Sequence, residues 1–291
     1  MDVDKLLQQY AAGKRNFCET NLREANLSGV ILYDVNLSKC DLRQVDLSEA
    51  TLEWASLIQA DLRGANLSGT KLCCADLSQA NLQEVNLSGA DLDWASLIQA
   101  DLGNTNLLDA AELYGINLSK VDLHGLNLSE IDLEGATLNE TRLSYTNLCR
   151  ARLGGIHSYK LDLRGANLTE ASFVNADLKE ALLQHTNCSR AFFFGAYLRN
   201  ANFNDADLSG ADLGETVMSG INLRNACLQK AILSYANLLE ADLSGADLSE
   251  AILWGASLKN ANLSKANLHG ANLNKVIFAN TIMPDGSIRN S

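Results

Sequence analysis

A spacing of five residues constrains this chain more than any other feature. Between residues 17 and 283, nearly every fifth residue is Leu or Phe, and the residue two positions earlier is almost always Ala or another small side chain. This spacing matches neither the period of a helix, about 3.6 residues, nor that of a strand, about 2. A short repeat sustained over such a length is typical of a solenoid, in which each unit packs on its neighbours. We therefore expect one continuous all-β domain over residues 17–283.

The repeat also indicates how the chain turns. Two of every five residues are apolar and the other three are polar or Gly, which suits a chain that runs extended briefly and then turns a corner. Four corners close a coil of about 20 residues, and stacked coils are expected at strand spacing, about 4.8 Å. About thirteen coils then make a rod on the order of 60 Å long.

The repeated units resemble those of the pentapeptide-repeat family, whose consensus is written A(D/N)LXX. The segments ANLSG at 25–29 and ADLSG at 241–245 match this consensus directly. The resemblance implies a right-handed quadrilateral parallel β-helix, a fold most abundant in bacteria and notably in cyanobacteria. The two ends of the chain are also similar to those of cyanobacterial members.

The flanking segments are expected to close the solenoid. Residues 1–16 contain a predicted short amphipathic helix at about 3–12, with Leu6, Leu7 and Tyr10 on one face, which covers the open first coil. At the other end, Pro284 lacks a backbone donor and is expected to end the ladder, so that residues 284–291 form a tail.

One irregularity interrupts the spacing. The Leu positions run every five residues up to Leu107 and again from Leu113, so one extra residue lies between them. An extra residue in a β-ladder produces a bulge. We expect a one-residue bulge near residues 108–112 within a single domain.

Composition excludes several classes of protein. The formal net charge of −12 opposes direct nucleic-acid binding, which needs a basic surface. No apolar stretch approaches the length of about 18 residues that a membrane span requires, and the N-terminus lacks the apolar core of a signal peptide. The seven Cys are odd in number and scattered, which is typical of reduced thiols. We therefore expect a cytoplasmic protein.

Outward residues that lie one coil apart form columns along the walls of the predicted coil. One wall pairs aspartates with arginines, such as Asp41 with Arg43, and the pairs neutralise each other in place. The next wall is a nearly uniform column of Asn with Ser two residues later, as at Asn66 and Ser68, and its amides are expected to hydrogen-bond along the column. We expect both walls to be solvated and structural.

A third side departs from this uniformity, because aromatic and apolar residues occupy its outward positions among several acids. Large exposed apolar patches usually mark interfaces, and Trp and Tyr are frequent hot-spot residues. The alternatives are tolerated surface substitutions, or a duplication recorded by the related segments TLEWASLIQADL and DLDWASLIQADL. The candidate interaction residues are Trp54, Trp94, Tyr114, Phe192, Phe194, Ile232, Ile252 and Trp254.

The sequence contains no recognisable catalytic constellation. Cys73 and Cys74 are adjacent and therefore too close for a CxxC redox or zinc motif. His157, Asp177 and Tyr197 share a column, but no nucleophile accompanies them. A tube filled by its own side chains is also expected to leave no substrate cavity. We expect a non-enzyme with no catalytic, cofactor or metal site and no small-molecule substrate.

The leading interpretation is a rigid scaffold or regulator that binds an unidentified protein, or a second copy of itself, through the aromatic and acidic side. The alternative comes from the family resemblance, because some pentapeptide-repeat proteins are acidic mimics of duplex DNA that engage DNA gyrase or another topoisomerase. The net charge supports that alternative. The paired Asp/Arg wall and the uncharged Asn/Ser wall oppose it, since a mimic should be broadly negative.

Overall fold

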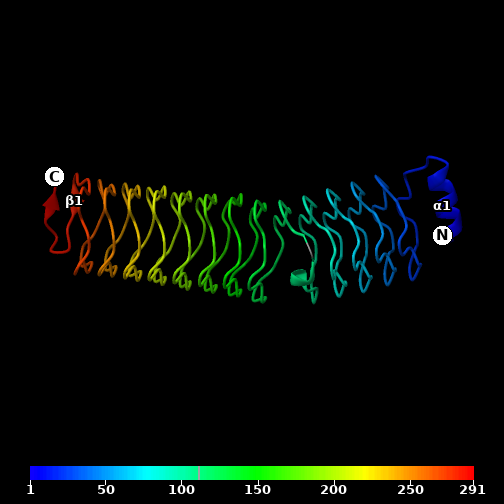
Figure 1. The fold of residues 1–291 in the computed structure, drawn as a ribbon, viewed down its shortest axis with the longest axis horizontal. Helices are drawn as coiled ribbons and strands as arrows, with labels where there is room; N and C mark the ends of the chain where they lie inside the picture. The colour runs from blue at the N-terminus through cyan, green and yellow to red at the C-terminus, as the bar shows by residue number, and fades with distance from the viewer. Residues whose placement is uncertain (111) are drawn as a thin grey trace. The chain divides into compact units, whose positions relative to one another are not determined.

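The computed structural model describes residues 1–110 and 112–291, which form two compact units, Met1–Asp122 (unit 1) and Leu123–Ser291 (unit 2). The named elements are one α-helix, α1 (Val3–Ala11), one short 3-10 helix, η1 (Leu107–Asp109), and two strands, β1 (Thr281–Ile282) and β2 (Ile288–Arg289) (Figure 1). Most of the remaining described chain alternates single β-bridges with turns.

Successive coils are joined by parallel β-bridges at a constant separation along the chain. In unit 1, the four bridge positions of one coil are Asn21↔Asp41, Asn26↔Asp46, Ile31↔Thr51 and Asn36↔Ser56. In unit 2, one coil pairs in the same way through Asn147↔Asn167, Arg152↔Ser172, His157↔Asp177 and Arg142↔Asp162. The four-bridge coil expected from the spacing of the Leu residues is therefore present in each unit.

Each corner is a tight turn that ends one repeat. At one such corner, the Ala25 N–H donates to the Leu22 carbonyl at 3.1 Å, and Glu24 has φ +58. A positive φ at the third residue is the signature of a type II turn. The Asn21 Oδ1 accepts the Arg23 N–H at 3.0 Å, so the polar residue before each Leu stabilises the corner as an Asx turn. Sequence reasoning missed this role of Asn and Asp.

The interior of the coils is filled by the repeated Leu and Ala side chains, which are almost all fully buried. Phe173 and Phe193 stack inside unit 2 with ring centroids 5.1 Å apart and nearly parallel planes, as their separation by one full coil predicts. The Phe203 ring meets Phe193 edge-on at 5.8 Å. Leu126, Leu268 and Leu273 are exceptions, because these inward side chains are only half-buried.

The two polar walls have the expected hydrogen bonds. Along the Asn column of unit 1, the Asn66 amide donates to Asp46 Oδ1 and the Asn86 amide donates to Asn66 Oδ1, both at 3.0 Å. On the charged wall, the guanidinium of Arg43 donates to both carboxylate oxygens of Asp41, at 2.8 and 2.6 Å. The amide contacts link neighbouring coils, and the Asp/Arg contacts neutralise the charges. Both walls therefore have a structural role.

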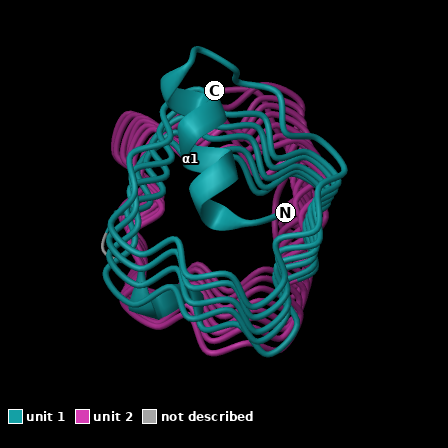
Figure 2. Ribbon diagram, turned by 90° about the vertical axis from the view of Figure 1, so that its right-hand side faces the viewer, with its two compact units in different colours: residues 1–122 teal, residues 123–291 magenta. Residues whose placement is uncertain are grey.

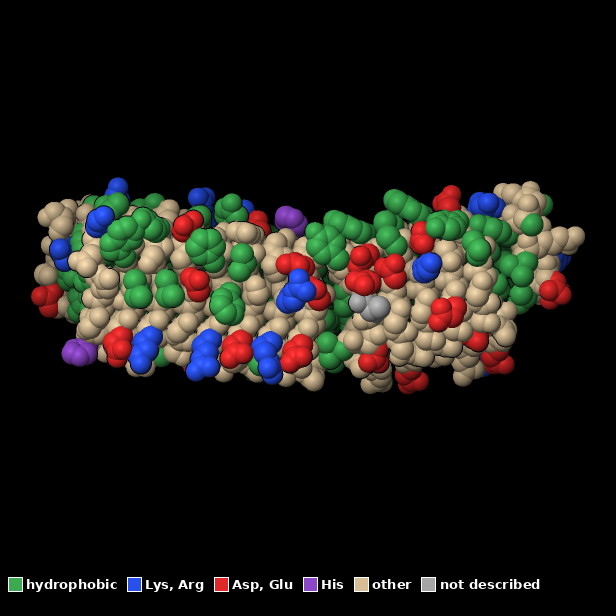
Figure 3. Space-filling view, viewed as in Figure 1, with side chains coloured by type: hydrophobic (Ala, Val, Ile, Leu, Met, Phe, Trp, Pro, Cys, Tyr) green, Lys and Arg blue, Asp and Glu red, His purple; other side chains and the backbone are tan. Residues whose placement is uncertain are grey.

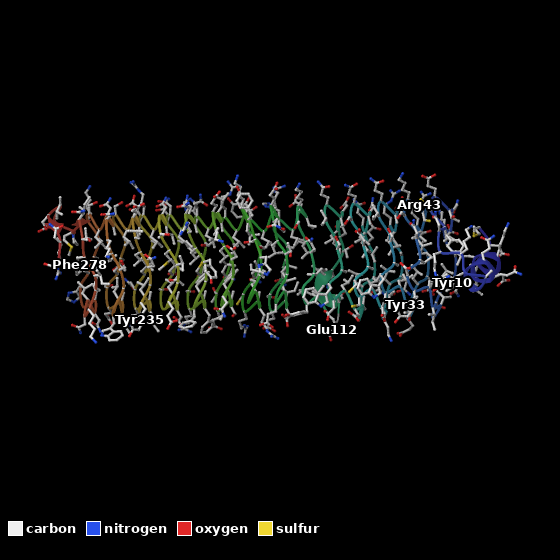
Figure 4. All side chains as sticks on the ribbon, turned by 90° about the horizontal axis from the view of Figure 1, so that it is seen from above. Tyr10, Tyr33, Arg43, Glu112, Tyr235 and Phe278 are labelled. Carbon is white, nitrogen blue, oxygen red and sulfur yellow. The ribbon has the colours of Figure 1, made fainter. Side chains whose placement is uncertain are left out.

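Helix α1 lies across the open end of the unit 1 coils (Figure 2). Its Leu6 side chain is fully buried, and its Tyr10 hydroxyl donates to the Tyr33 carbonyl at 3.0 Å (Figure 4). The amino group of Met1 donates to the Asn21 carbonyl. These contacts attach α1 to the first coils of unit 1.

The C-terminal end of unit 2 is a small antiparallel hairpin, in which β1 pairs with β2 through Thr281↔Arg289 and Ile282↔Ile288. Pro284 lies in the turn between the strands, and its carbonyl accepts the Lys265 N–H at 3.0 Å. Ile282 of β1 still bridges in parallel to Asn262, so the antiparallel pair follows the last parallel bridge at this end.

The bridge register changes once within unit 1. The bridges Asp91↔Glu112 and Ser96↔Asn117 join residues whose separation is one position longer than in the preceding coils. The 3-10 helix η1 begins inside this stretch and is capped by Asn106, whose Oδ1 accepts the Leu108 N–H at 3.3 Å. The bulge expected at residues 108–112 falls partly on residue 111, which lies outside the described residues.

Candidate interaction surface

The best candidate surface in unit 1 is built on one corner column. Trp54, Cys74 and Trp94 follow each other at steps of one coil, and all three have positive φ, at +60, +60 and +58. Trp54 and Trp94 are 64% and 58% exposed. An ordinary residue in the left-handed conformation loses about 1–2 kcal/mol. These two indoles are therefore held outward in a backbone conformation that favours Gly.

Because the register here is one residue longer, Gly115 takes the next position of this column, and Tyr114, which is 47% exposed, lies beside it in the column of Asp93. Its ring meets the Trp94 indole edge-on, with centroids 5.2 Å apart and planes at 77°. The indole also lies over Gly115, where a Cβ would approach the Trp94 ring within 2.6 Å. The absence of a side chain at Gly115 thus leaves the space that the indole occupies. Hydrophobic side chains gather beside acidic ones on unit 1 (Figure 3).

Two half-buried acids, Glu53 and Asp93, immediately precede the two tryptophans in the sequence. Glu53 Oε2 accepts the Tyr33 hydroxyl at 2.7 Å, and this hydrogen bond raises the pKa of Tyr33. Asp93 Oδ1 accepts the Tyr114 N–H at 2.8 Å. We refer to Trp54, Trp94 and Tyr114 with Glu53 and Asp93 as the aromatic corner.

The remaining candidate residues lie in unit 2. Phe192, Phe194, Ile232 and Ile252 are exposed as expected. Ile232 and Ile252 are bridge partners and lie side by side, whereas Asp212 separates Ile232 from Phe192 in the same column. Their apolar row is therefore interrupted by a carboxylate.

Trp254, which was also predicted as an outward candidate residue, is only half-buried. The Tyr235 ring meets it edge-on at 4.7 Å, and the Lys275 ammonium lies 4.6 Å from the centre of its ring. Tyr235 is exposed and points away from the coils, and sequence reasoning did not select it (Figure 4). Tyr235 and Trp254 are separated by one residue less than a full coil. The corner residue Tyr235 therefore lies beside Trp254, which belongs to the adjoining wall of the next coil. This spacing could have identified Tyr235 from the sequence.

The contacts of Cys73, Cys74 and His157 do not indicate a catalytic or metal site. Cys73 and Cys74 are free, with their sulfurs 3.6 Å apart, and burial raises the pKa of Cys73 to about 12. His157 bridges to Asp177, but the Asp177 carboxylate accepts the Lys179 ammonium at 3.0 Å. Among the described residues, no group of three or more His, Cys, Asp or Glu is arranged to hold a metal ion.

A corner column of unit 2 carries charges of both signs that were not singled out from the sequence. Basic and acidic side chains on adjacent coils form ion pairs along it, and charged side chains are visible on the surface (Figure 3). The pairs are Glu130–Arg150 at 3.4 Å, Glu170–Arg190 at 3.6 Å and Lys230–Glu250 at 3.7 Å. Exposed pairs of this kind contribute little stability, about 0–1 kcal/mol each.

Hollows lie on the outer surface of unit 2, although the tube itself is filled as expected. The interior is filled, but a hollow of about 470 Å³ opens on the outside around Arg164 and Tyr145. A second hollow, of about 520 Å³, lies at the turn of the C-terminal hairpin around Pro284. No helix in the described part of the chain combines the length and apolarity needed to cross a bilayer.

The repeat itself matches a known family description. The family model "Pentapeptide repeats" matches the chain in eight copies, which cover residues 16–48, 46–73, 75–110, 116–155, 162–200, 201–238 and 241–280. No curated protein matches the chain.

Several solved structures are similar to this chain. HetL, a pentapeptide-repeat protein involved in heterocyst differentiation regulation in the cyanobacterium Nostoc sp. strain PCC 7120, is 32% identical over 99% of this chain and 100% of its own, with a TM-score of 0.31. A second Nostoc protein, alr5209, is 36% identical over 38% of this chain and 93% of its own, with a TM-score of 0.23. QnrB1, a plasmid-mediated fluoroquinolone resistance protein, is 15% identical over 90% of this chain and 89% of its own, with a TM-score of 0.27.

Proposed function

This chain belongs to the pentapeptide-repeat family, and we propose that it is a non-enzymatic scaffold that binds another protein through the aromatic corner of unit 1. We also propose that its coils are right-handed and number about thirteen, at the strand spacing of about 4.8 Å. The observation that carries the functional proposal is the exposure of Trp54, Trp94 and Tyr114 together beside two acids.

The aromatic corner has the chemistry of a binding hot spot. Hot spots are enriched in Trp and Tyr, and truncation of a hot-spot residue costs about 2 kcal/mol or more in binding free energy. Trp94 and Tyr114 already pack against each other at 5.2 Å, so both rings are held in place before a partner arrives. The free surface therefore presents large rings that lose little freedom on binding.

The backbone beneath these rings is also fixed. The Trp54 N–H donates to the Cys73 carbonyl at 3.1 Å, and the Trp94 N–H donates to the Tyr114 carbonyl at 2.9 Å. Each corner is thus tied to the next coil by a hydrogen bond. A rigid surface reduces the entropic cost of association, which is what a scaffold requires.

The chemistry of the corner favours a partner that carries Arg. An Arg guanidinium packs flat on an indole through a cation–π contact and pairs with carboxylates in a fork. Glu53 and Asp93 lie next to the two indoles in the sequence and are only half-buried. A partner segment with an Arg next to an apolar residue would therefore match both the exposed indoles and the neighbouring carboxylates.

The charge arrangement favours this proposal over DNA mimicry. On the wall of unit 1, Asp41 is neutralised by Arg43 and Asp61 by Arg63, at 2.6 and 2.7 Å. On unit 2, a corner column carries charges of both signs, which pair as Glu130 with Arg150, Glu170 with Arg190 and Lys230 with Glu250. A mimic of the DNA backbone needs rows of one sign, whereas these rows carry both signs.

A peptide selection tests the proposal. The whole protein is used to select binders from a random peptide library, and the Kd of the selected peptides is measured by fluorescence polarisation. We expect peptides with Arg beside an apolar residue, and a loss of tenfold or more in affinity, about 1.4 kcal/mol, for Trp54→Ser/Trp94→Ser. The matched control is Phe192→Ser/Phe194→Ser in unit 2, which should bind normally. Equal affinity of the Trp variant and the wild type contradicts the proposal.

A further inference from the structure

The hollow of about 470 Å³ on the outside of unit 2 has the size of a small-molecule site, which is typically about 300–1,000 Å³. It is lined by side chains from successive coils, including Arg142, Arg164, Tyr145, Gln184 and His185. These residues lie on one wall and its adjoining corner, because their positions repeat at steps of one coil. None of them belongs to the aromatic corner.

A glycine creates the hollow. The corner column reads Tyr145, Gly165 and His185, and Gly165 has φ +66. A Cβ at Gly165 would come within 2.6 Å of the Tyr145 ring, so this ring lies over the glycine. The ring also meets His124 edge-on at 5.6 Å. Tyr145 is nevertheless 68% exposed, so much of its ring is open to a ligand.

Arg164 is held in one orientation at this hollow. Its Nε and one Nη donate to the two oxygens of Asp162 at 2.9 and 2.8 Å. Asp162 is buried, and the hydrogen bond from Arg164 lowers its pKa, so the pair is ionised. The fork with Asp162 leaves the second Nη of Arg164 for a ligand. A guanidinium fixed in this way suits recognition of a phosphate group.

Gln184 supplies a polar atom in need of a partner. Its Oε1 is the one buried side-chain nitrogen or oxygen without a hydrogen bond in the described part of the chain. A buried acceptor without a donor is costly, and such an atom in a native protein requires an explanation. Gln184 lines the hollow, so a bound ligand with an N–H or O–H group beside it would supply the missing hydrogen bond to Oε1.

We propose that this hollow binds a mononucleotide, with its phosphate on Arg164, its base against the ring of Tyr145 and one of its N–H or O–H groups donated to Gln184 Oε1. Stacking on an aromatic side chain stabilises a bound base whatever its sequence identity. The site differs from the sequence-based expectation of no small-molecule ligand, and it is independent of protein binding by unit 1.

Calorimetric titration of the whole protein with AMP, GMP, CMP and UMP tests the proposal, with adenosine and inorganic phosphate as partial ligands. We expect at least one nucleotide to bind, and at least tenfold more tightly than either partial ligand. Binding of none of the four nucleotides up to about 10 mM overturns the proposal. Adenosine or phosphate binding as tightly as the nucleotide overturns it as well.

Two variants test the assigned contacts. Tyr145→Ala should weaken nucleotide binding about tenfold, whereas the control Tyr159→Ala, which removes an exposed ring outside the hollow, should leave it unchanged. Gln184→Leu should weaken binding without lowering Tm, because it removes an unsatisfied buried acceptor. A lower Tm with unchanged binding means that Gln184 is structural and overturns its assignment.

Discussion

The indole of Trp94 lies over Gly115 so closely that a Cβ at Gly115 would come within 2.6 Å of its ring. The same indole packs edge-on against Tyr114 at 5.2 Å. The position of the Trp94 ring in the aromatic corner therefore depends on the absence of a side chain at Gly115.

Replacement of this glycine should have a double effect. Gly115→Ala places a side chain at φ +65 and also displaces the indole, whereas Gly29→Ala has the same φ of +65 and meets nothing within 4 Å. We expect a loss of about 1 kcal/mol from the backbone in each variant, and about 1 kcal/mol more in Gly115→Ala. Thermal unfolding measures the difference. Equal losses would show that the Trp94 ring is not held over Gly115.

The stacked phenylalanines of unit 2 should dominate its local stability. Phe193→Ala removes a buried ring that contacts Phe173 at 5.1 Å and Phe203 at 5.8 Å, so we expect a loss of about 3–5 kcal/mol. The neighbouring Phe194 is exposed, and Phe194→Ala should change stability by about 0.5 kcal/mol or less. Urea unfolding compares the two variants. Similar losses for both would contradict the inward and outward placement of these residues.

The Asp41–Arg43 pair should make stability depend on pH. The hydrogen bonds from Arg43 lower the pKa of Asp41 to about 2, below its unfolded value of about 3.9. A carboxyl whose pKa is lower in the folded state stabilises above its unfolded pKa, and the contribution is lost as pH falls toward 2. Arg43→Gln should therefore flatten the fall in Tm between about pH 4 and pH 2. The control Arg150→Gln, which breaks an exposed pair with Glu130, should keep the wild-type slope.

The Asn column should be sensitive to a change of one atom. Asn66→Asp keeps the acceptor for the Ser68 N–H, but it loses the amide that donates to Asp46 at 3.0 Å and sets two carboxylates side by side. We expect a loss of about 1 kcal/mol at pH 7, with partial recovery near pH 4, where carboxyls begin to take up protons. Thermal unfolding at the two pH values measures this. A pH-independent loss would indicate that only the hydrogen bond matters.

The coil could be predicted from the sequence because its period is simple. A separation of one full coil accounts for the contact of Phe173 with Phe193 and for that of Asn66 with Asp46. These contacts lie along one column, so arithmetic on residue numbers is sufficient to find them.

Contacts between neighbouring columns were missed because they depend on side-chain direction. Tyr235 and Trp254 belong to different columns, yet their rings meet at 4.7 Å and half-bury Trp254. The hollow of unit 2 was missed for a related reason, although Tyr145 and Gly165 share one column, since the direction of the Tyr145 ring decides how much of the space over Gly165 it fills. The position of a ring over a glycine follows from backbone dihedrals and rotamers, and the spacing of the repeat contains neither.

The central claim is that the aromatic corner of unit 1 binds an Arg-bearing segment of a partner, and the chain contains three tryptophans with which to test it. An NMR titration of isotope-labelled protein with a selected peptide follows the three indole N–H signals. The same peptide with citrulline in place of Arg is the control. Binding should shift the signals of Trp54 and Trp94, leave that of Trp254 unchanged, and weaken with citrulline. A bound peptide that shifts only Trp254, or none of the three, would contradict the claim.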